Sequence, residues 1–108
     1  MFTEKEQNIL RQFKTIITTK FPGEISEILI FGSKARSDSK EDSDVDILVI
    51  TESEDWNLMR SIRDIAYDLE LENEVILSIQ IFSKSYTEFL RSFRSQFINN
   101  VDRESVVL

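Results

Sequence analysis

EILIFGSKARSDSKEDSDVDILVI, residues 27–50, is the most informative segment of the chain. Its first apolar run is followed by Gly32-Ser33, and after ten intervening residues Asp44 and Asp46 introduce a second apolar run. Nearly unbroken apolar runs of this length are typical of strands that are buried on both faces. The segment therefore predicts two core strands, 27–31 and 44–50, separated by a short helix at 34–36 and a polar loop at 37–43.

Periodicity and turn signals predict the elements around these two strands. A capping-box pattern at residues 3–6 opens a first helix, which ends at 21–23 and has apolar positions at Ile9, Leu10, Phe13, Ile16 and Ile17. The other expected elements are a helix over about 55–71, a strand over 74–82, a helical region from a second capping-box pattern at 85–88 to about Asp102, and a short edge strand or packed tail at 106–108. We therefore expect one α/β (α+β) domain over residues 1–108, a small mixed sheet with helices packed on it.

The composition excludes several kinds of site and partner. The 108 residues include no cysteine and no histidine, so disulfides, thiolate metal sites and histidine-based triads are impossible, and carboxylates remain as metal ligands. A net charge of −7 disfavours a general attraction to nucleic acid. No apolar run has the length of a membrane span, and the N-terminus lacks a signal-peptide pattern. We expect a cytoplasmic protein without membrane or strong nucleic-acid binding, which could form oligomers.

Gly32, Ser33, Asp44 and Asp46 together suggest a site for phosphate and a divalent cation. Glycine lets a backbone approach a phosphate closely, and Ser33 can add a hydroxyl and an N–H donor. Asp44 and Asp46 are two residues apart, so in a strand both carboxylates lie on one face, roughly 6–7 Å apart along the backbone. Carboxylates at that spacing repel each other unless a cation or a proton lies between them. Mg²⁺, which prefers oxygen ligands, would relieve this repulsion.

Two segments of the chain resemble a known family. Gly32-Ser33-Lys34-Ala35-Arg36 and the segment 43–49, SDVDILV, resemble the minimal nucleotidyltransferases (MNT proteins) of the DNA polymerase β-like superfamily. The similarity covers most of the chain, and residues 31–50 carry its specific part. The resemblance implies that Asp44 and Asp46 ligate two Mg²⁺ (or Mn²⁺) ions about 3.5–4 Å apart. It also implies that Gly32 and Ser33 position the triphosphate of ATP or another NTP.

The resemblance assigns a role to the positive charges after the Gly-Ser pair. Arg36, and with it Lys34, would neutralise phosphate charge. For both residues the alternative is a solvated surface position. Ser37 stands where many relatives have glycine, a departure that would stiffen the loop.

A third carboxylate is the part of the pattern that this sequence lacks. Active members usually carry it on the strand after the long helix, where the expected positions here are Ser78 or Gln80, and neither side chain can ionise. Glu74 shares their face by strand alternation, but it lies roughly 13–20 Å from them along the strand and is better interpreted as a solvated strand-entry residue. The metal that activates the nucleophile should therefore be held more weakly than the metal on the nucleotide.

Three functions are compatible with these residues. The first is an enzyme that transfers a nucleoside monophosphate from an NTP to a hydroxyl on another protein. In the family that partner is usually a small helical HEPN protein, with the MNT protein as antitoxin of the pair. The second is a catalytically weak or inactive member that neutralises its partner by contact. The third is a Ca²⁺ site in the loop 38–46, which ranks last because that loop has no glycine.

Overall fold

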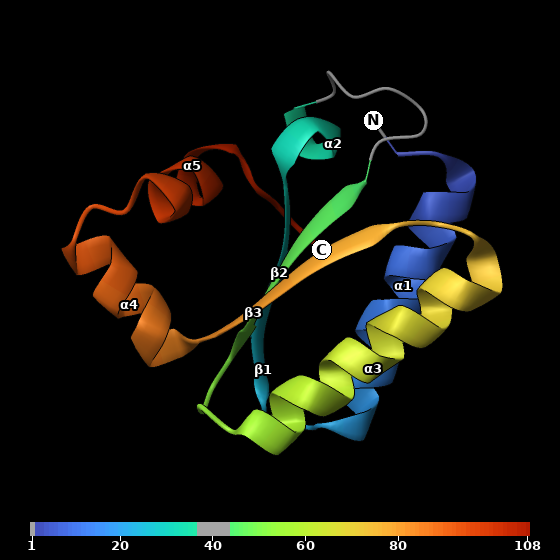
Figure 1. Cartoon of the computed structure of the whole chain (residues 1–108), viewed down its shortest axis with the longest axis horizontal. Helices are drawn as coiled ribbons and strands as arrows, with labels where there is room; N and C mark the ends of the chain where they lie inside the picture. The colour runs from blue at the N-terminus through green and yellow to red at the C-terminus, as the bar shows by residue number, and fades with distance from the viewer. Residues whose placement is uncertain (1, 37–43) are drawn as a thin grey trace.

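The computed structural model describes residues 2–36 and 44–108, with the backbone alone at residues 33 and 36. The loop 37–43, with Ser37, lies outside the described residues. In the described ranges the element order is α1 (Glu4–Lys20), β1 (Ile25–Phe31), α2 (Gly32–Arg36), β2 (Val45–Thr51), α3 (Trp56–Asn73), β3 (Leu77–Ser83), α4 (Lys84–Ser92), α5 (Gln96–Glu104) and β4 (Val106–Val107) (Figure 1). Among these helices, none combines the length and the apolar character that a bilayer crossing requires.

The strands form one mixed sheet in the order β3-β2-β1-β4. β1 is antiparallel to β2 and to β4, whereas β3 is parallel to β2. A parallel neighbour needs a crossover connection, and α3 provides it between β2 and β3. The small mixed sheet with packed helices predicted from the sequence is therefore confirmed.

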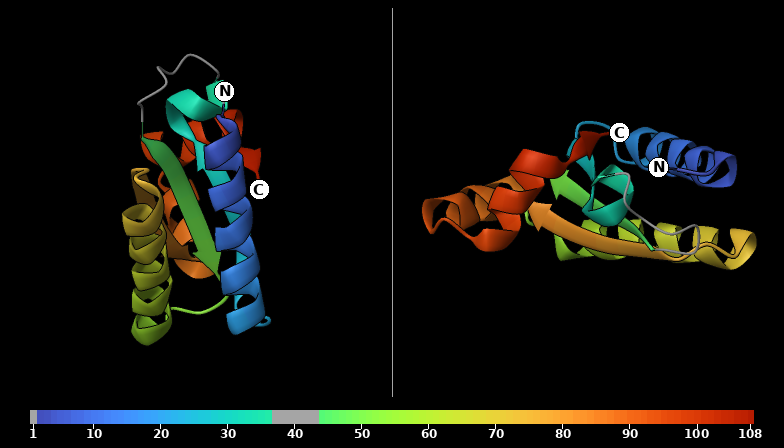
Figure 2. Two further views of the ribbon diagram at one scale, coloured as in Figure 1. Left: turned by 90° about the vertical axis from the view of Figure 1, so that its right-hand side faces the viewer. Right: turned by 90° about the horizontal axis from the view of Figure 1, so that it is seen from above.

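Helices cover both faces of this sheet. Figure 1 and the view from above in Figure 2 show α1 and α3 on one side, with α4 and α5 on the other. Side chains alternate between two buried clusters, as expected for strands buried on both faces. The cluster under α1 and α3 takes Ile28 and Ile30 of β1 and Val45, Ile47 and Val49 of β2. The cluster under α5 takes Leu29, Leu48 and Ile50, together with Ile98 and Val101.

α1 begins as its sequence predicts. The Thr3 hydroxyl accepts a hydrogen bond from the Glu6 N–H, and the Glu6 carboxylate accepts one from the Thr3 N–H, so the capping box is complete. Four of the five apolar positions face the core, but Ile16 is 37% exposed. Ile16 lies at the edge of the apolar stripe, and Ile17 takes the core position instead.

The C-terminal helical region consists of two helices. Ser83, not Ser85, caps α4, because its hydroxyl accepts the Tyr86 N–H at 3.1 Å. The chain then turns through Arg94, whose φ is +56°, and Ser95 caps α5. Across this turn the Arg91 guanidinium donates two hydrogen bonds to the Asp102 carboxylate, at 2.9 and 2.8 Å. These hydrogen bonds hold the pKa of Asp102 below its usual value.

Candidate functional site

The turn after β1 lies directly against the second aspartate. Phe31, the last residue of β1, pairs with Asp46 of β2, so Gly32 begins α2 beside the Asp46 side chain. Gly32 has a φ of +75°, in the left-handed region that glycine adopts readily. A Cβ added there would collide with the Asp46 carboxylate oxygen and lie 3.1 Å from its Cγ. Only glycine therefore allows the backbone to approach this carboxylate so closely.

Asp46 points to the face of the sheet that carries α4 and α5. It shares strand parity with Leu48 and Ile50, which belong to the cluster under α5. The apolar part of β2 is buried, whereas Asp46 at its start is only partly buried. This places a carboxylate at the end of a buried strand, where the sheet meets solvent.

Asp44 lies one residue before β2 and is exposed. The residue between the two aspartates, Val45, is fully buried, and its N–H donates to the Ile76 carbonyl at 3.0 Å. Val45 thus fixes the start of the strand between the two acids. Both acids are at the same end of β2 as the Gly32 turn, because Gly32 follows the strand that runs antiparallel to β2.

The register with β3 identifies the residue beside Asp46. Ser78 pairs with Asp46, whereas Gln80 pairs with Leu48, one step further into the sheet. Ser78 is partly buried and Gln80 is exposed. Of the two positions predicted for a third acid, the sheet thus puts Ser78 next to the aspartate. Across residues 2–36 and 44–108, no three acidic side chains gather in a way that could hold a metal ion.

Glu74 is not a strand residue, so its expected place at the entry of the third strand is wrong. It caps the C-terminus of α3 with φ +55° and ψ +41°, and its N–H donates to the Glu70 carbonyl. β3 begins only at Leu77. α3 extends to Asn73, two residues beyond the expected end at 71, and the left-handed Glu74 ends it. The Glu74 side chain is exposed, as expected.

Lys34 is buried, which excludes the solvated surface position for this residue. Its ammonium lies 3.1 Å from the Glu6 carboxylate, and the two side chains are 1% and 6% exposed. In the sequence, Glu6 is identifiable only as part of a capping-box pattern. Nothing in a capping-box pattern indicates a partner 28 positions later in the chain, so sequence reasoning missed this pair.

Ser33 and Arg36 are described by their backbone, which belongs to α2. Their position follows from that of Gly32, since all three are on the same short helix between β1 and the loop. The roles predicted for their side chains stay predictions.

Aromatic rings adjoin the Gly32 turn on the same face of the sheet as Asp46. Phe31 contacts Phe97 of α5 edge to face, with ring centroids 5.3 Å apart, and Phe97 contacts Phe82 of β3 at 5.8 Å. α5 is thereby packed close to the turn, as Figure 1 also shows for α2 and α5. Phe97 of α5 therefore packs on Phe31, the residue that pairs with Asp46.

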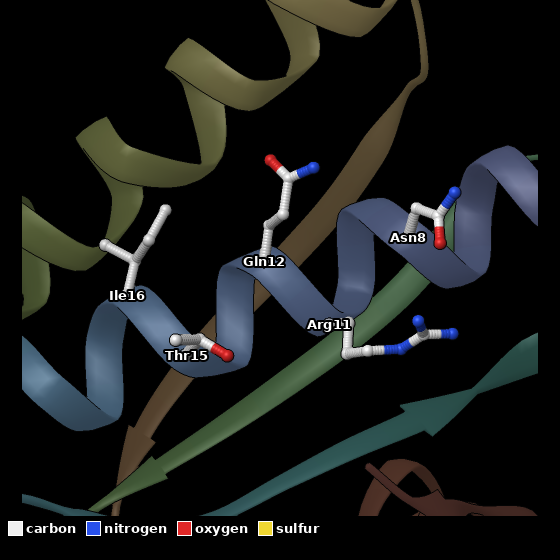
Figure 3. Close-up of a pocket in the computed structure, with 5 residues that line it drawn as sticks. All are labelled: Asn8, Arg11, Gln12, Thr15 and Ile16. Atoms are coloured by element: carbon white, nitrogen blue, oxygen red, sulfur yellow. The ribbon is translucent and has the colours of Figure 1, made fainter.

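Three hollows formed by described residues are lined without Asp44 or Asp46. One is formed by a single face of α1, where Asn8, Arg11, Gln12, Thr15 and Ile16 project from the same helix (Figure 3). It contains no carboxylate and no glycine turn. Two others adjoin Trp56, Met59 and Ile81. The close approach of Gly32 to Asp46 therefore marks the candidate site.

Known proteins are similar to this chain over most of its length. The model of the family described as "Nucleotidyltransferase domain" matches residues 10–102. A candidate protein adenylyltransferase from Methanocaldococcus jannaschii is 29% identical over 107 residues, which are 95% of this chain and 97% of that protein.

Two solved structures have a similar fold. One is a candidate minimal nucleotidyltransferase, with a TM-score of 0.56, 22% identity and 94% of each chain covered. The other is a toxin–antitoxin structure with AMP-PNP, with a TM-score of 0.56, 18% identity, and coverage of 89% of this chain and 69% of that chain. Because the family model spans most of the sequence, this chain belongs to the nucleotidyltransferase domain family, and the resemblance predicted from residues 31–50 is confirmed.

Proposed function

We propose that this protein binds an NTP with Mg²⁺ or Mn²⁺, with ATP as the first choice, and transfers its nucleoside monophosphate to a hydroxyl on a partner protein. The observation that carries this proposal is the contact between Gly32 and Asp46. It brings a glycine turn suited to phosphate and a carboxylate suited to a cation within reach of one ligand.

The residues present fit a divalent cation bound together with a nucleotide. Asp44 and Asp46 provide carboxylate oxygens at the solvent end of β2, beside a backbone that a phosphate can approach. Gly32 and Ser33 would position the triphosphate, and Arg36 would neutralise part of its charge. A cation at the two acids would offset phosphate charge and lower the pKa of an attacking hydroxyl.

The transfer itself is a displacement at phosphorus. The acceptor oxygen would bond to the α-phosphorus while the bond from that phosphorus to the bridging oxygen of the β-phosphate breaks. Pyrophosphate leaves, and the hydroxyl proton passes to solvent. The contribution of Asp44, Asp46 and the Gly32 turn is to align the phosphates, which is how proteins accelerate phosphoryl transfer.

Ser78 is expected to limit the rate of this transfer. It pairs with Asp46 and is one of the two positions, with Gln80, where the resemblance expects a third acid. A serine hydroxyl is a poorer ligand for Mg²⁺ than a carboxylate. We therefore expect nucleotide binding to persist and transfer to be slow unless the partner supplies another ligand.

A partner protein as acceptor is supported by two comparisons. The relative from M. jannaschii is named for adenylyl transfer to protein, and one structural neighbour is a toxin–antitoxin structure with AMP-PNP. We propose that this chain likewise acts on, or together with, a second protein of the HEPN type in the cytoplasm. The alternative is an inactive subunit that neutralises the partner by contact, and Ser78 beside Asp46 is the observation that favours it.

Label transfer separates the two functions. The protein is incubated with α-³²P-labelled ATP, Mg²⁺ or Mn²⁺, and the protein encoded by the neighbouring gene. The enzyme proposal expects label on that protein, lost in Asp44→Asn and Asp46→Asn. The alternative expects no label, with both variants neutralising the partner as well as the unmodified chain does.

A further inference from the structure

The pair formed by Glu6 and Lys34 joins the first turn of α1 to α2. Its carboxylate and ammonium groups are 3.1 Å apart, with side chains 6% and 1% exposed. Charges are found in such a buried position when they are paired, because water no longer solvates them. The pair therefore fixes the middle of α2 against the first turn of α1.

Both oxygens of the Glu6 carboxylate are engaged. Oε1 accepts the Thr3 N–H at 2.8 Å, and Oε2 faces the Lys34 ammonium. The Thr3 hydroxyl in turn accepts the Glu6 N–H at 3.1 Å. The capping box thus holds this carboxylate in one orientation, and the carboxylate holds Lys34.

Lys34 is two residues after Gly32, in the same short helix. A shift of Lys34 would move the backbone of the turn relative to Asp46, whose carboxylate already leaves no room for a Cβ on Gly32. The position of the turn therefore depends on Glu6 of α1, through the ion pair that Glu6 makes with Lys34.

We propose that Glu6 is a positioning residue for the phosphate-binding turn and that it acts through Lys34. Lys34 is then an anchor of α2 rather than a phosphate ligand. This inference rests on the proposed function, since it concerns how the same site is held in place.

The direction in which one substitution changes the affinity for Mg²⁺-AMP-PNP shows whether Lys34 is an anchor or a phosphate ligand. Glu6→Gln keeps a side chain that can complete the capping box but removes the charge opposite Lys34. If Lys34 anchors α2, the dissociation constant for Mg²⁺-AMP-PNP should rise by about tenfold. If Lys34 were a phosphate ligand held back by Glu6, the substitution would free it and binding would tighten, which would overturn the proposal.

Thr3→Ala is the matched control. It removes the other half of the capping box and lowers the thermal stability of α1, but it leaves the charge pair intact. Its dissociation constant for Mg²⁺-AMP-PNP should stay within about twofold of the unmodified protein. Equal weakening by Glu6→Gln and Thr3→Ala would mean that α1 stability alone matters, and this too would overturn the proposal.

The double variant Glu6→Gln/Lys34→Met guards against a failure to fold, because it removes both charges of the buried Glu6–Lys34 ion pair together. It should bind Mg²⁺-AMP-PNP more tightly than Glu6→Gln alone. A phosphate ligand at Lys34 would predict the reverse order, with the double variant the weaker of the two.

The backbone amide signals of Gly32 and Ser33, followed by NMR without nucleotide, test the positioning independently of binding. They should shift in Glu6→Gln and stay in place in Thr3→Ala. Should the unmodified protein fail to bind Mg²⁺-AMP-PNP, the proposed function fails, while these amide signals still decide whether Glu6 sets the turn.

Discussion

Gly32 and Asp46 are in contact across the end of β1 and β2, so closely that a Cβ on the glycine would occupy the space of the carboxylate. Gly23 provides a comparison within the same chain. Its φ is +76°, almost equal to the +75° of Gly32, but a Cβ added there would meet nothing within 4 Å. The two glycines thus share a backbone conformation and differ in their surroundings.

Gly32→Ala should therefore affect the site more than Gly23→Ala. Both variants place alanine at a positive φ, which costs about 1 kcal/mol in the free energy of unfolding. Only Gly32→Ala also displaces the Asp46 carboxylate, so we expect it to raise the dissociation constant for Mg²⁺-ATP by about tenfold or more. Calorimetric titration of both variants, with thermal unfolding alongside, measures the difference. Equal affinities in the two variants would show that the contact does not matter for binding.

Ser78→Asp should strengthen the metal site, because residue 78 pairs with Asp46 in the parallel ladder. Three carboxylates at one end of the sheet repel each other without a cation, so the variant should gain more thermal stability from Mg²⁺ than the unmodified protein does. Transfer of label to the partner should also increase.

Gln80→Asp is the control for that prediction. Residue 80 pairs with Leu48, one step away from the aspartates, and its side chain is exposed. Gln80→Asp adds the same negative charge as Ser78→Asp, but the charge is not beside Asp46. A Mg²⁺-dependent stabilisation as large in Gln80→Asp as in Ser78→Asp would contradict the assignment of residue 78.

The contact between Arg91 and Asp102 should contribute stability that depends on pH. The Asp102 pKa is lowered in the folded protein, so its contribution is present above the unfolded value of about 3.9 and is lost as pH falls through the folded value. Because both side chains are more than 40% exposed, solvent screening limits it to about 0.2–1 kcal/mol.

Chemical denaturation tests this contact through a double-mutant cycle of Arg91→Met and Asp102→Asn. The coupling energy should be measurable at pH 7 and should approach zero as pH falls through the lowered pKa of Asp102 in the folded protein. A coupling energy that stays constant over this range would mean that the two side chains interact through packing rather than charge.

The residues of the proposed site could be read from the sequence because they are close together in it. Residues 27–50 contain most of both central strands, the glycine turn and both aspartates, and adjacent antiparallel strands bring such segments together. The burial of Ile47, Leu48 and Val49 follows from the same apolar run.

Features that depend on tertiary contacts could not be read in this way. The pairing of Glu6 with Lys34 requires α1 to lie beside α2, which no local pattern encodes. The choice between Ser78 and Gln80 required the register of β3, and that strand starts later than its apolar run suggested. Glu74 ends α3 in a left-handed conformation that is usual for glycine and uncommon for glutamate.

We propose that Asp44, Asp46 and the Gly32 turn hold a nucleotide together with a divalent cation. Calorimetric titration of ATP into the unmodified protein and into Asp46→Asn, with Mg²⁺ and then with EDTA, tests it most directly. We predict saturable binding that requires Mg²⁺ and that is lost in Asp46→Asn while the variant remains folded. Binding of equal strength in the variant, or binding that EDTA leaves unchanged, would contradict the claim.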